Sequence, residues 1–145
     1  MPAVMAVIFA FSAMPGEESG DTSGALLMFV AGAMEKLGHL PFSADQLAVL
    51  HHVIRKIAHF TEFAILGVTT VIALYNKNRS RSCNYLLPII IAVLYACSDE
   101  FHQLFVPGRA GTIKDVLVDS LGALTGVTLT WLWFLKHYSV KRAVE

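Results

Sequence analysis

Three apolar stretches, each about 20 residues long, constrain the fold of this chain most, because a helix of that length crosses the hydrocarbon core of a bilayer. They cover residues 57–75, 85–105 and 116–135. The chain has 145 residues, of which 55% are hydrophobic and only 15% charged, whereas soluble domains are about a quarter charged. The sequence therefore predicts an all-α membrane protein built as a single domain over residues 1–145.

The first third of the chain is less regular. Residues 1–14 are apolar but too short to cross a bilayer alone. We interpret them as a short first transmembrane helix. The alternative is the apolar region of a signal peptide, although no basic residue precedes it. The apolar run at residues 25–37 predicts an interfacial helix, and Ser43 is a potential N-cap for the helix that follows. We expect a bundle of about four transmembrane helices, the first one short, plus an interfacial helix.

The distribution of lysine and arginine predicts the orientation of the bundle in the membrane. Basic residues concentrate in the loop at residues 76–84 and in the C-terminal tail, namely at Lys77, Arg79, Arg81, Lys136, Lys141 and Arg142. Because short cytoplasmic loops carry an excess of lysine and arginine, both segments are expected in the cytoplasm. Residues 15–55 and the loop at residues 106–114 then lie outside. This orientation predicts a multi-pass protein of the cell membrane with a cytoplasmic C-terminus.

Ionisable residues gather at the same end of all three predicted spans. They occupy the first two turns of the first span, the last two turns of the second and the start of the third, which places them near the extracytoplasmic face. Charges inside a bilayer are costly and indicate function by default. The alternative is that basic residues neutralise the carboxylates and only hold the bundle together. The candidate ligand-binding residues are Arg55, Lys56, His59, Glu62, Asp99, Glu100, His102, Gln103, Arg109, Asp115 and Asp119.

One face of the last predicted span combines small and acidic residues. Asp115, Asp119, Gly122 and Gly126 follow the spacing i, i+4, i+7, i+11 and so share one helical stripe. A GxxxG pair lets a second helix approach closely. We therefore expect Gly122 and Gly126 to contact a neighbouring helix, and the two aspartates to face that same neighbour.

The sequence resembles the VanZ-like family in three segments that match in order and spacing. These are the runs RKIAHFTEF with LG at residues 66–67, SDEFHQLFVPGR at residues 98–109, and DV with Asp119, Gly122 and Gly126. The signature region covers residues 55–126. The resemblance implies a small membrane protein of the teicoplanin-resistance type. It does not supply a biochemical mechanism.

Two positions depart from the pattern of the family. Relatives commonly have a full first transmembrane helix that ends near a serine, whereas the corresponding helix here is short and ends at Phe11 and Ser12. Relatives often have asparagine where this chain has Asp119, so the resemblance does not make a charge at this position obligatory for the family.

The interpretation we favour is a polar site at the outer leaflet that binds or modulates a membrane lipid. Basic residues beside the carboxylates suit an anionic lipid or a lipid-linked cell-wall precursor. Pro107 and Gly108 predict a tight turn that presents Arg109, whose guanidinium can hold a phosphate in bidentate fashion. By the resemblance, such a protein would lower susceptibility to teicoplanin.

The alternative is a membrane enzyme that acts on a lipid phosphate or headgroup. The candidate catalytic residues are His59, Glu62, Asp99, His102 and Asp115, with a histidine as general base and a carboxylate orienting it. No known nucleophile motif is present, so the assignment as an enzyme stays open.

A metal-dependent variant of the enzyme uses a divalent manganese, iron or zinc ion. Its candidate ligands are His59 with Glu62 and Asp99 with His102, because each pair lies one helical turn apart. Ion conduction is disfavoured, since the inner halves of the spans lack ionisable residues.

Charge and cysteine positions bear on nucleic-acid binding and on a disulfide. The formal net charge is zero, and no basic patch indicates nucleic-acid binding. Cys83 and Cys97 are expected as free thiols, because a helix separates them by roughly 20 Å. The oligomeric state is left open.

Overall fold

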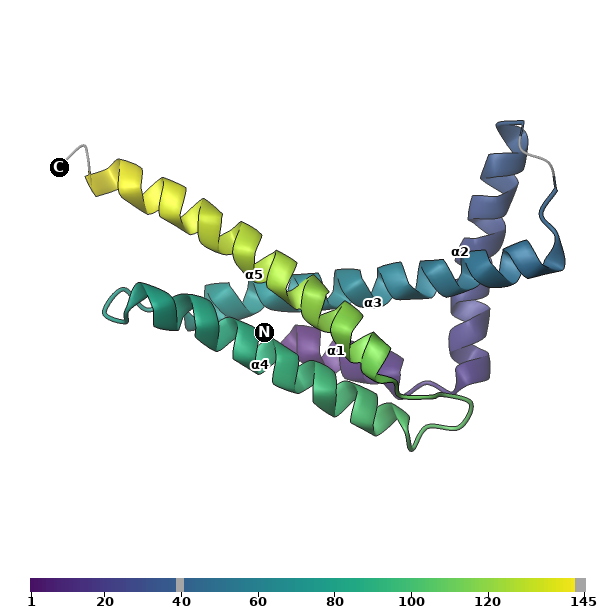
Figure 1. Ribbon diagram of the computed structural model, residues 1–145, viewed down its shortest axis with the longest axis horizontal. Coiled ribbons are helices and arrows are strands. Elements are labelled where there is room, and N and C mark those ends of the chain that lie inside the picture. Colours follow the sequence, from purple (N-terminus) through teal and green to yellow (C-terminus); the bar gives the residue numbers. More distant parts are fainter. Residues whose placement is uncertain (39–40, 143–145) are drawn as a thin grey trace.

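The computed structural model describes residues 1–38 and 41–142, with side chains except those of residues 17–22 and 138–142. These ranges contain five helices joined by loops (Figure 1) and no strand, so the predicted all-helical class is confirmed. The helices are α1 (Pro2–Ser12), α2 (Gly16–Lys36), α3 (Ala44–Leu74), α4 (Arg81–Gln103) and α5 (Ile113–Arg142).

The distribution of side chains over α3, α4 and α5 is that of a membrane protein. These are the described helices long and apolar enough to cross a bilayer. Their exposed surface carries large apolar residues such as Ile65, Ile90 and Leu121, whereas buried positions include the small Ala96 and the charged Asp119. Since large apolar side chains in water would be buried first, the outer surface of the bundle is suited to contact lipid. The three predicted spans are thereby confirmed as apolar helices.

The closest helix pair is α3 with α5, and glycines make the contact. A Cβ atom added at Gly122 would collide with the carbonyl oxygen of Phe60, and one at Gly126 with that of Ala64. Gly67 of α3 lies equally close to the backbone of α5. Gly122 meets Phe60 and Gly126 meets Ala64, so residue numbers increase in the same direction along both helices. Helices α3 and α5 therefore run parallel. The predicted role of the GxxxG pair is confirmed.

Helix α4 runs antiparallel to these two and packs against both. At the end near the loop at residues 75–80, the Tyr85 hydroxyl lies 3.1 Å from the Thr128 hydroxyl, and the Tyr75 and Phe134 rings stack with centroids 4.9 Å apart. Aromatic side chains at the end of α3, the start of α4 and the end of α5 therefore gather at one end of the bundle, opposite the loop between α4 and α5.

Helix α3 joins two segments that the sequence pattern separates, namely the helix capped by Ser43 and the apolar run that starts at residue 57. Ser43 is its N-cap, as predicted: the Ser43 hydroxyl accepts from the Gln46 amide at 3.3 Å, and the Gln46 side chain accepts from the Ser43 amide at 2.9 Å. One uninterrupted helix then runs through Arg55 into the apolar run, so Ile57 begins the apolar run but not the helix. His59 lies about four turns into the helix rather than in its first two.

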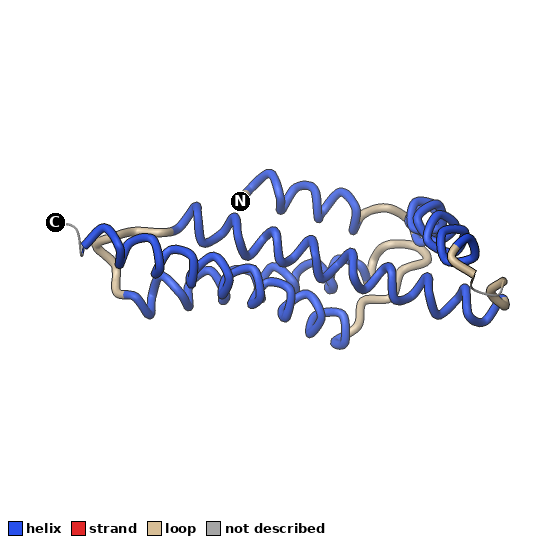
Figure 2. Tube along the Cα trace, turned by 90° about the horizontal axis from the view of Figure 1, so that it is seen from above, coloured by secondary structure: helices blue, strands red, loops and turns tan. Residues whose placement is uncertain are grey.

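Helix α2 also differs from the expected arrangement. It begins at Gly16, so the polar stretch before the predicted interfacial helix is helical as well. The Gly16 amide donates to the Pro107 carbonyl oxygen at 3.0 Å, and this tertiary contact fixes a start that local sequence does not show. The helix lies across the long axis of the bundle (Figures 1 and 2). An interfacial location for it stays a prediction.

Helix α1 packs against α3 and α4 along one flank of the bundle (Figure 2). Its residues Pro2–Ser12 rise about 16 Å, roughly half of the bilayer core. Three helices are thus long enough to cross a membrane, and the expectation of a fourth crossing by α1 stays a prediction. Both cysteines are free thiols at exposed positions, as expected.

Candidate functional site

A cavity of about 240 Å³ lies where α1 and α2 meet α3, near the loop between α4 and α5. Its apolar walls come from both N-terminal helices and from α3, and its polar groups come from α1, α2, α3, α4 and the loop. The lining residues are Ile8, Phe11, Ser12, Met14, Ser23, Leu26, Ile54, Arg55, Ala58, His59, Glu62, Asp99 and Arg109. Five of the candidate ligand-binding residues therefore share one cavity.

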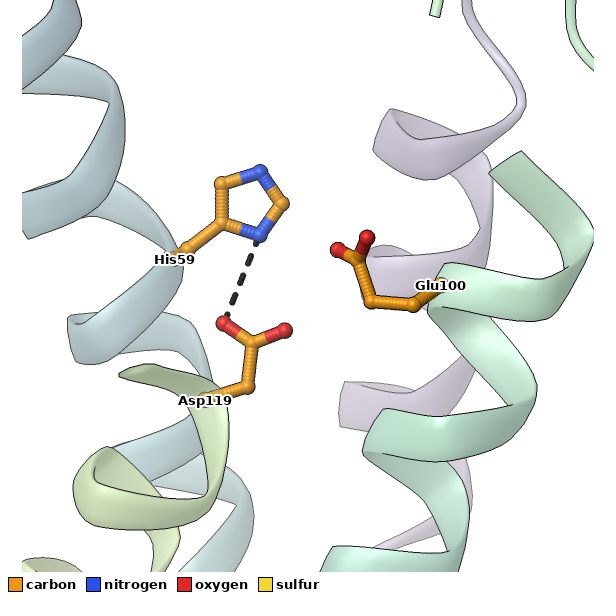
Figure 3. A group of neighbouring side chains, drawn as sticks. All are labelled: His59, Glu100 and Asp119. Carbon is orange, nitrogen blue, oxygen red and sulfur yellow. Dashed lines mark ion pairs between the residues drawn. The ribbon is translucent and has the colours of Figure 1, made fainter. Parts of the chain in front are cut away.

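A second group of polar residues lies next to the cavity and shares His59 with it. His59 of α3, Glu100 of α4 and Asp119 of α5 point toward one another (Figure 3). The nearest ligand atoms of the three side chains all lie within 4.8 Å of one another. The His59 Nδ1 atom is 3.6 Å from the Asp119 Oδ1 atom. Three helices thus contribute one side chain each to this group.

The neighbouring charges are paired in other ways. Lys56 of α3 forms a salt bridge with Asp115 of α5, one turn from the His59–Asp119 pair. Asp99 accepts a hydrogen bond of 3.1 Å from the Gln103 side chain on the same helix. The two aspartates of α5 therefore both face α3, as the helical stripe predicted.

The loop between α4 and α5 is built around Arg109. The Arg109 amide donates to the Val106 carbonyl oxygen at 3.1 Å, and Gly108 has a φ of 74°. This geometry is the tight turn predicted from Pro107 and Gly108, with glycine in the left-handed conformation that a side chain disfavours.

The side chain of Arg109 reaches back to the end of α1. Its Nε and Nη2 atoms donate to the carbonyl oxygens of Met14 and Phe11, at 3.1 and 2.7 Å. Partial burial lowers the pKa of the Arg109 guanidinium, with a smaller contribution from the nearby positive charge of Arg55. The group stays charged at neutral pH, because arginine is not deprotonated in proteins. Arg109 therefore tethers α1 and also lines the cavity.

His102 lies apart from both groups. Its ring stacks on that of Phe9 with centroids 4.7 Å apart, and it does not line the cavity. The structure thus groups His59 with Glu100 and Asp119, whereas the sequence pairs His59 with Glu62 and Asp99 with His102 as candidate metal ligands.

Sequence reasoning missed the contribution of the N-terminal helices to the cavity. Ser12 is buried at the end of α1, and Ile8 lies one turn before it on the same face. Both line the cavity, as does Leu26 of α2. Because α1 is apolar on all sides, its hydrophobic pattern does not indicate which face is buried.

The fold and the polar groups define a small multi-pass membrane protein with ionisable residues buried between its helices. Comparison with family models matches residues 1–135 to the VanZ/LLP1 model. The chain belongs to the VanZ/LLP1 family, and the resemblance in the signature region is confirmed. Neither the comparison with curated proteins nor that with solved structures gives a match.

Proposed function

We propose that the cavity binds the phosphate-bearing headgroup of an anionic lipid or lipid-linked cell-wall precursor in the outer leaflet. The proposal rests on one observation. Arg55 and Arg109 line the same cavity as several apolar side chains, inside a bundle whose outer surface is apolar. Arginine holds phosphate oxygens through several N–H groups. Arg109 uses two of its five N–H groups on α1, which keeps further donors for a phosphate.

The size of the cavity favours a headgroup over a whole lipid. Its volume of about 240 Å³ is below the roughly 300–1,000 Å³ of pockets that enclose drug-sized ligands. Phe11 and Leu26 line it and are 44% and 50% exposed, so they provide apolar contacts for acyl chains outside the cavity. The proposed occupant places its phosphate inside and its chains along the surface of the bundle.

The acidic residues of the cavity restrict the chemistry of the headgroup. Glu62 and Asp99 line the same space as the two arginines. Carboxylates accept hydrogen bonds from hydroxyl groups, whereas they repel a phosphate. A headgroup that carries hydroxyl groups beside its phosphate matches both parts of the lining, so we propose a glycerol or sugar phosphate.

Catalysis on the same phosphate ester is the second candidate function, and the His59–Asp119 pair favours it. A histidine next to a buried carboxylate can serve as a general base. His59 lines the cavity, and its Nδ1 atom lies 3.6 Å from Asp119. The imidazole therefore adjoins the proposed position of the headgroup.

The cellular test compares two antibiotics that share a target but differ in an acyl chain. A protein that acts on lipids at the outer leaflet should affect teicoplanin more than vancomycin, because the acyl chain anchors teicoplanin in the membrane. Expression in a susceptible Gram-positive host should raise the inhibitory concentration of teicoplanin more than that of vancomycin.

The variant Glu62→Gln should lose this effect, and Glu35→Gln, at an exposed position at the end of α2, should keep it. Equal protection against both drugs would contradict an action at the lipid interface. Protection that survives Glu62→Gln would exclude the cavity as its source, and no protection against either drug would reject the resistance role.

A further inference from the structure

The group formed by His59, Glu100 and Asp119 contains two buried carboxylates that each have an oxygen without a hydrogen-bond partner in the described part of the chain. Asp119 is fully buried, and Glu100 is 4% exposed. Asp119 Oδ2 and Glu100 Oε1 have no hydrogen-bond partner among the described residues. Both side chains point into the space that they share with His59 (Figure 3). Charged groups without partners are costly inside a bilayer.

The basic side chains nearest the group have partners of their own outside it. Lys56 is paired with Asp115, and Arg109 is bound to the end of α1. His59 approaches Asp119 only to 3.6 Å, longer than an ordinary charge-assisted hydrogen bond of about 2.7–2.9 Å. The group therefore has two acidic side chains and an imidazole arranged around a space that suits a cation.

We propose that His59, Glu100 and Asp119 bind one divalent transition-metal ion between α3, α4 and α5. A divalent cation would neutralise both carboxylates and accept the lone pair of the neutral imidazole. The proposal does not depend on lipid binding, because Glu100 and Asp119 do not line the cavity.

The distances are compatible with this assignment after a small inward movement of the side chains. Metal–ligand bonds of about 2.0–2.2 Å hold ligand atoms about 3–4 Å apart. The three ligand atoms lie within 4.8 Å of one another, so rotations that move them by about an ångström close the site.

The Glu100 side chain is already oriented for this role. Its Oε2 atom accepts from the Thr112 amide at 2.9 Å, and its Oε1 atom is the one without a partner. A hydrogen bond that fixes a metal-ligating carboxylate in this way is a usual feature of metal sites. The loop between α4 and α5 would thus orient a ligand as well as tether α1.

The donor set restricts the metal. One nitrogen and two carboxylate oxygens suit zinc, manganese or iron, whereas soft ions such as Cu(I) prefer sulfur ligands. Three protein ligands also leave coordination positions open, as in catalytic zinc sites. His59 belongs to the group and also lines the cavity. An open coordination position on the metal would therefore adjoin the proposed lipid phosphate.

The test uses the full-length protein, purified in detergent and stripped of metal with a chelator. Titration with Zn²⁺ and, separately, with Mn²⁺ should yield about one bound equivalent per chain by elemental analysis after desalting. The variants Asp119→Asn and Glu100→Gln should weaken binding by at least about a hundredfold, beyond what loss of an outer partner causes.

Matched controls separate this site from the other acidic and histidine residues. Glu62→Gln and His102→Gln carry equivalent changes on neighbouring turns of α3 and α4 and should retain metal binding. If either control loses the metal as fully as Asp119→Asn, the proposed ligand set is wrong.

A second measurement guards against variants that fail to fold. A ligand that binds only the folded protein raises its melting temperature as ligand concentration rises. The melting temperature of the wild-type protein should therefore rise with Zn²⁺ or Mn²⁺. Less than about a tenth of an equivalent bound, together with an unchanged melting temperature, would overturn the proposal and indicate that protons neutralise the carboxylates.

Discussion

The Arg109 guanidinium donates a hydrogen bond to the Phe11 carbonyl oxygen, 2.7 Å away, and so ties the loop between α4 and α5 to the end of α1. A second bond of 3.1 Å to the Met14 carbonyl oxygen strengthens this link. The carbonyl groups at the end of a helix lack partners within the helix. Arg109 provides these partners and thereby closes one wall of the cavity.

Replacing Arg109 should loosen α1 without unfolding the rest of the bundle. Hydrogen bonds to a charged group contribute about 1.5–3 kcal/mol each, and Arg109→Gln removes two of them. Amide hydrogen exchange should become faster in α1 and stay unchanged in the buried parts of α3, α4 and α5. Lys114→Gln, at an exposed position near the same loop, is the control. Unchanged exchange in α1 of Arg109→Gln would show that the tether does not hold the helix.

The contact between α3 and α5 should tolerate no added methyl group at Gly126. Gly126→Ala places a Cβ atom against the backbone carbonyl of Ala64, and overpacking of this kind costs about 1–3 kcal/mol. Gly32→Ala is the matched control, because nothing lies within 4 Å of the added atom. Thermal unfolding in detergent should show a lower melting temperature for Gly126→Ala and an equal or higher one for Gly32→Ala. Equal melting temperatures would contradict the observed close approach.

The orientation of the bundle predicts opposite labelling of its two connecting loops. The basic loop between α3 and α4 is expected in the cytoplasm, and the loop between α4 and α5 outside. Both Ala110 and Asn78 are exposed. In a background with Cys83→Ser and Cys97→Ser, Ala110→Cys should react with an impermeant maleimide in intact cells, whereas Asn78→Cys should react only after permeabilisation. The reverse pattern would place the polar site at the cytoplasmic face.

The three long helices could be predicted because apolar length is a strong constraint on a membrane-spanning helix. The Ser43 N-cap of α3 could be predicted as well, but the continuity of the helix could not, because Arg55 and Lys56 precede the apolar run and resemble its boundary. In the structure Lys56 is paired with Asp115, and Arg55 lines the cavity. Asp115 of α5 therefore compensates for the charge of Lys56, and Arg55 faces the cavity.

The candidate site was predictable along each helix but not between helices. Helical spacing placed Asp119 on the face of α5 that meets α3, and the structure pairs it with His59. On α4, adjacent residues point about 100° apart, so the rotation of the helix decides which carboxylate faces His59. That rotation places Glu100 rather than Asp99 in the group with His59 and Asp119. The packing of side chains from three helices sets this rotation of α4, so the sequence of α4 alone does not predict it.

The binding of an anionic lipid headgroup in the cavity is the central claim, and native mass spectrometry of the purified protein tests it most directly. Protein released from detergent with an equimolar mixture of phosphatidylglycerol and phosphatidylcholine should retain phosphatidylglycerol, because only this lipid combines a net negative charge with headgroup hydroxyls. Arg55→Gln should lose about tenfold or more in affinity, as expected when a charge-assisted contact of at least about 1.4 kcal/mol is removed. Arg81→Gln, at the opposite end of the bundle, should not. Equal retention of both lipids by the wild-type protein, or unchanged retention by Arg55→Gln, would contradict the claim.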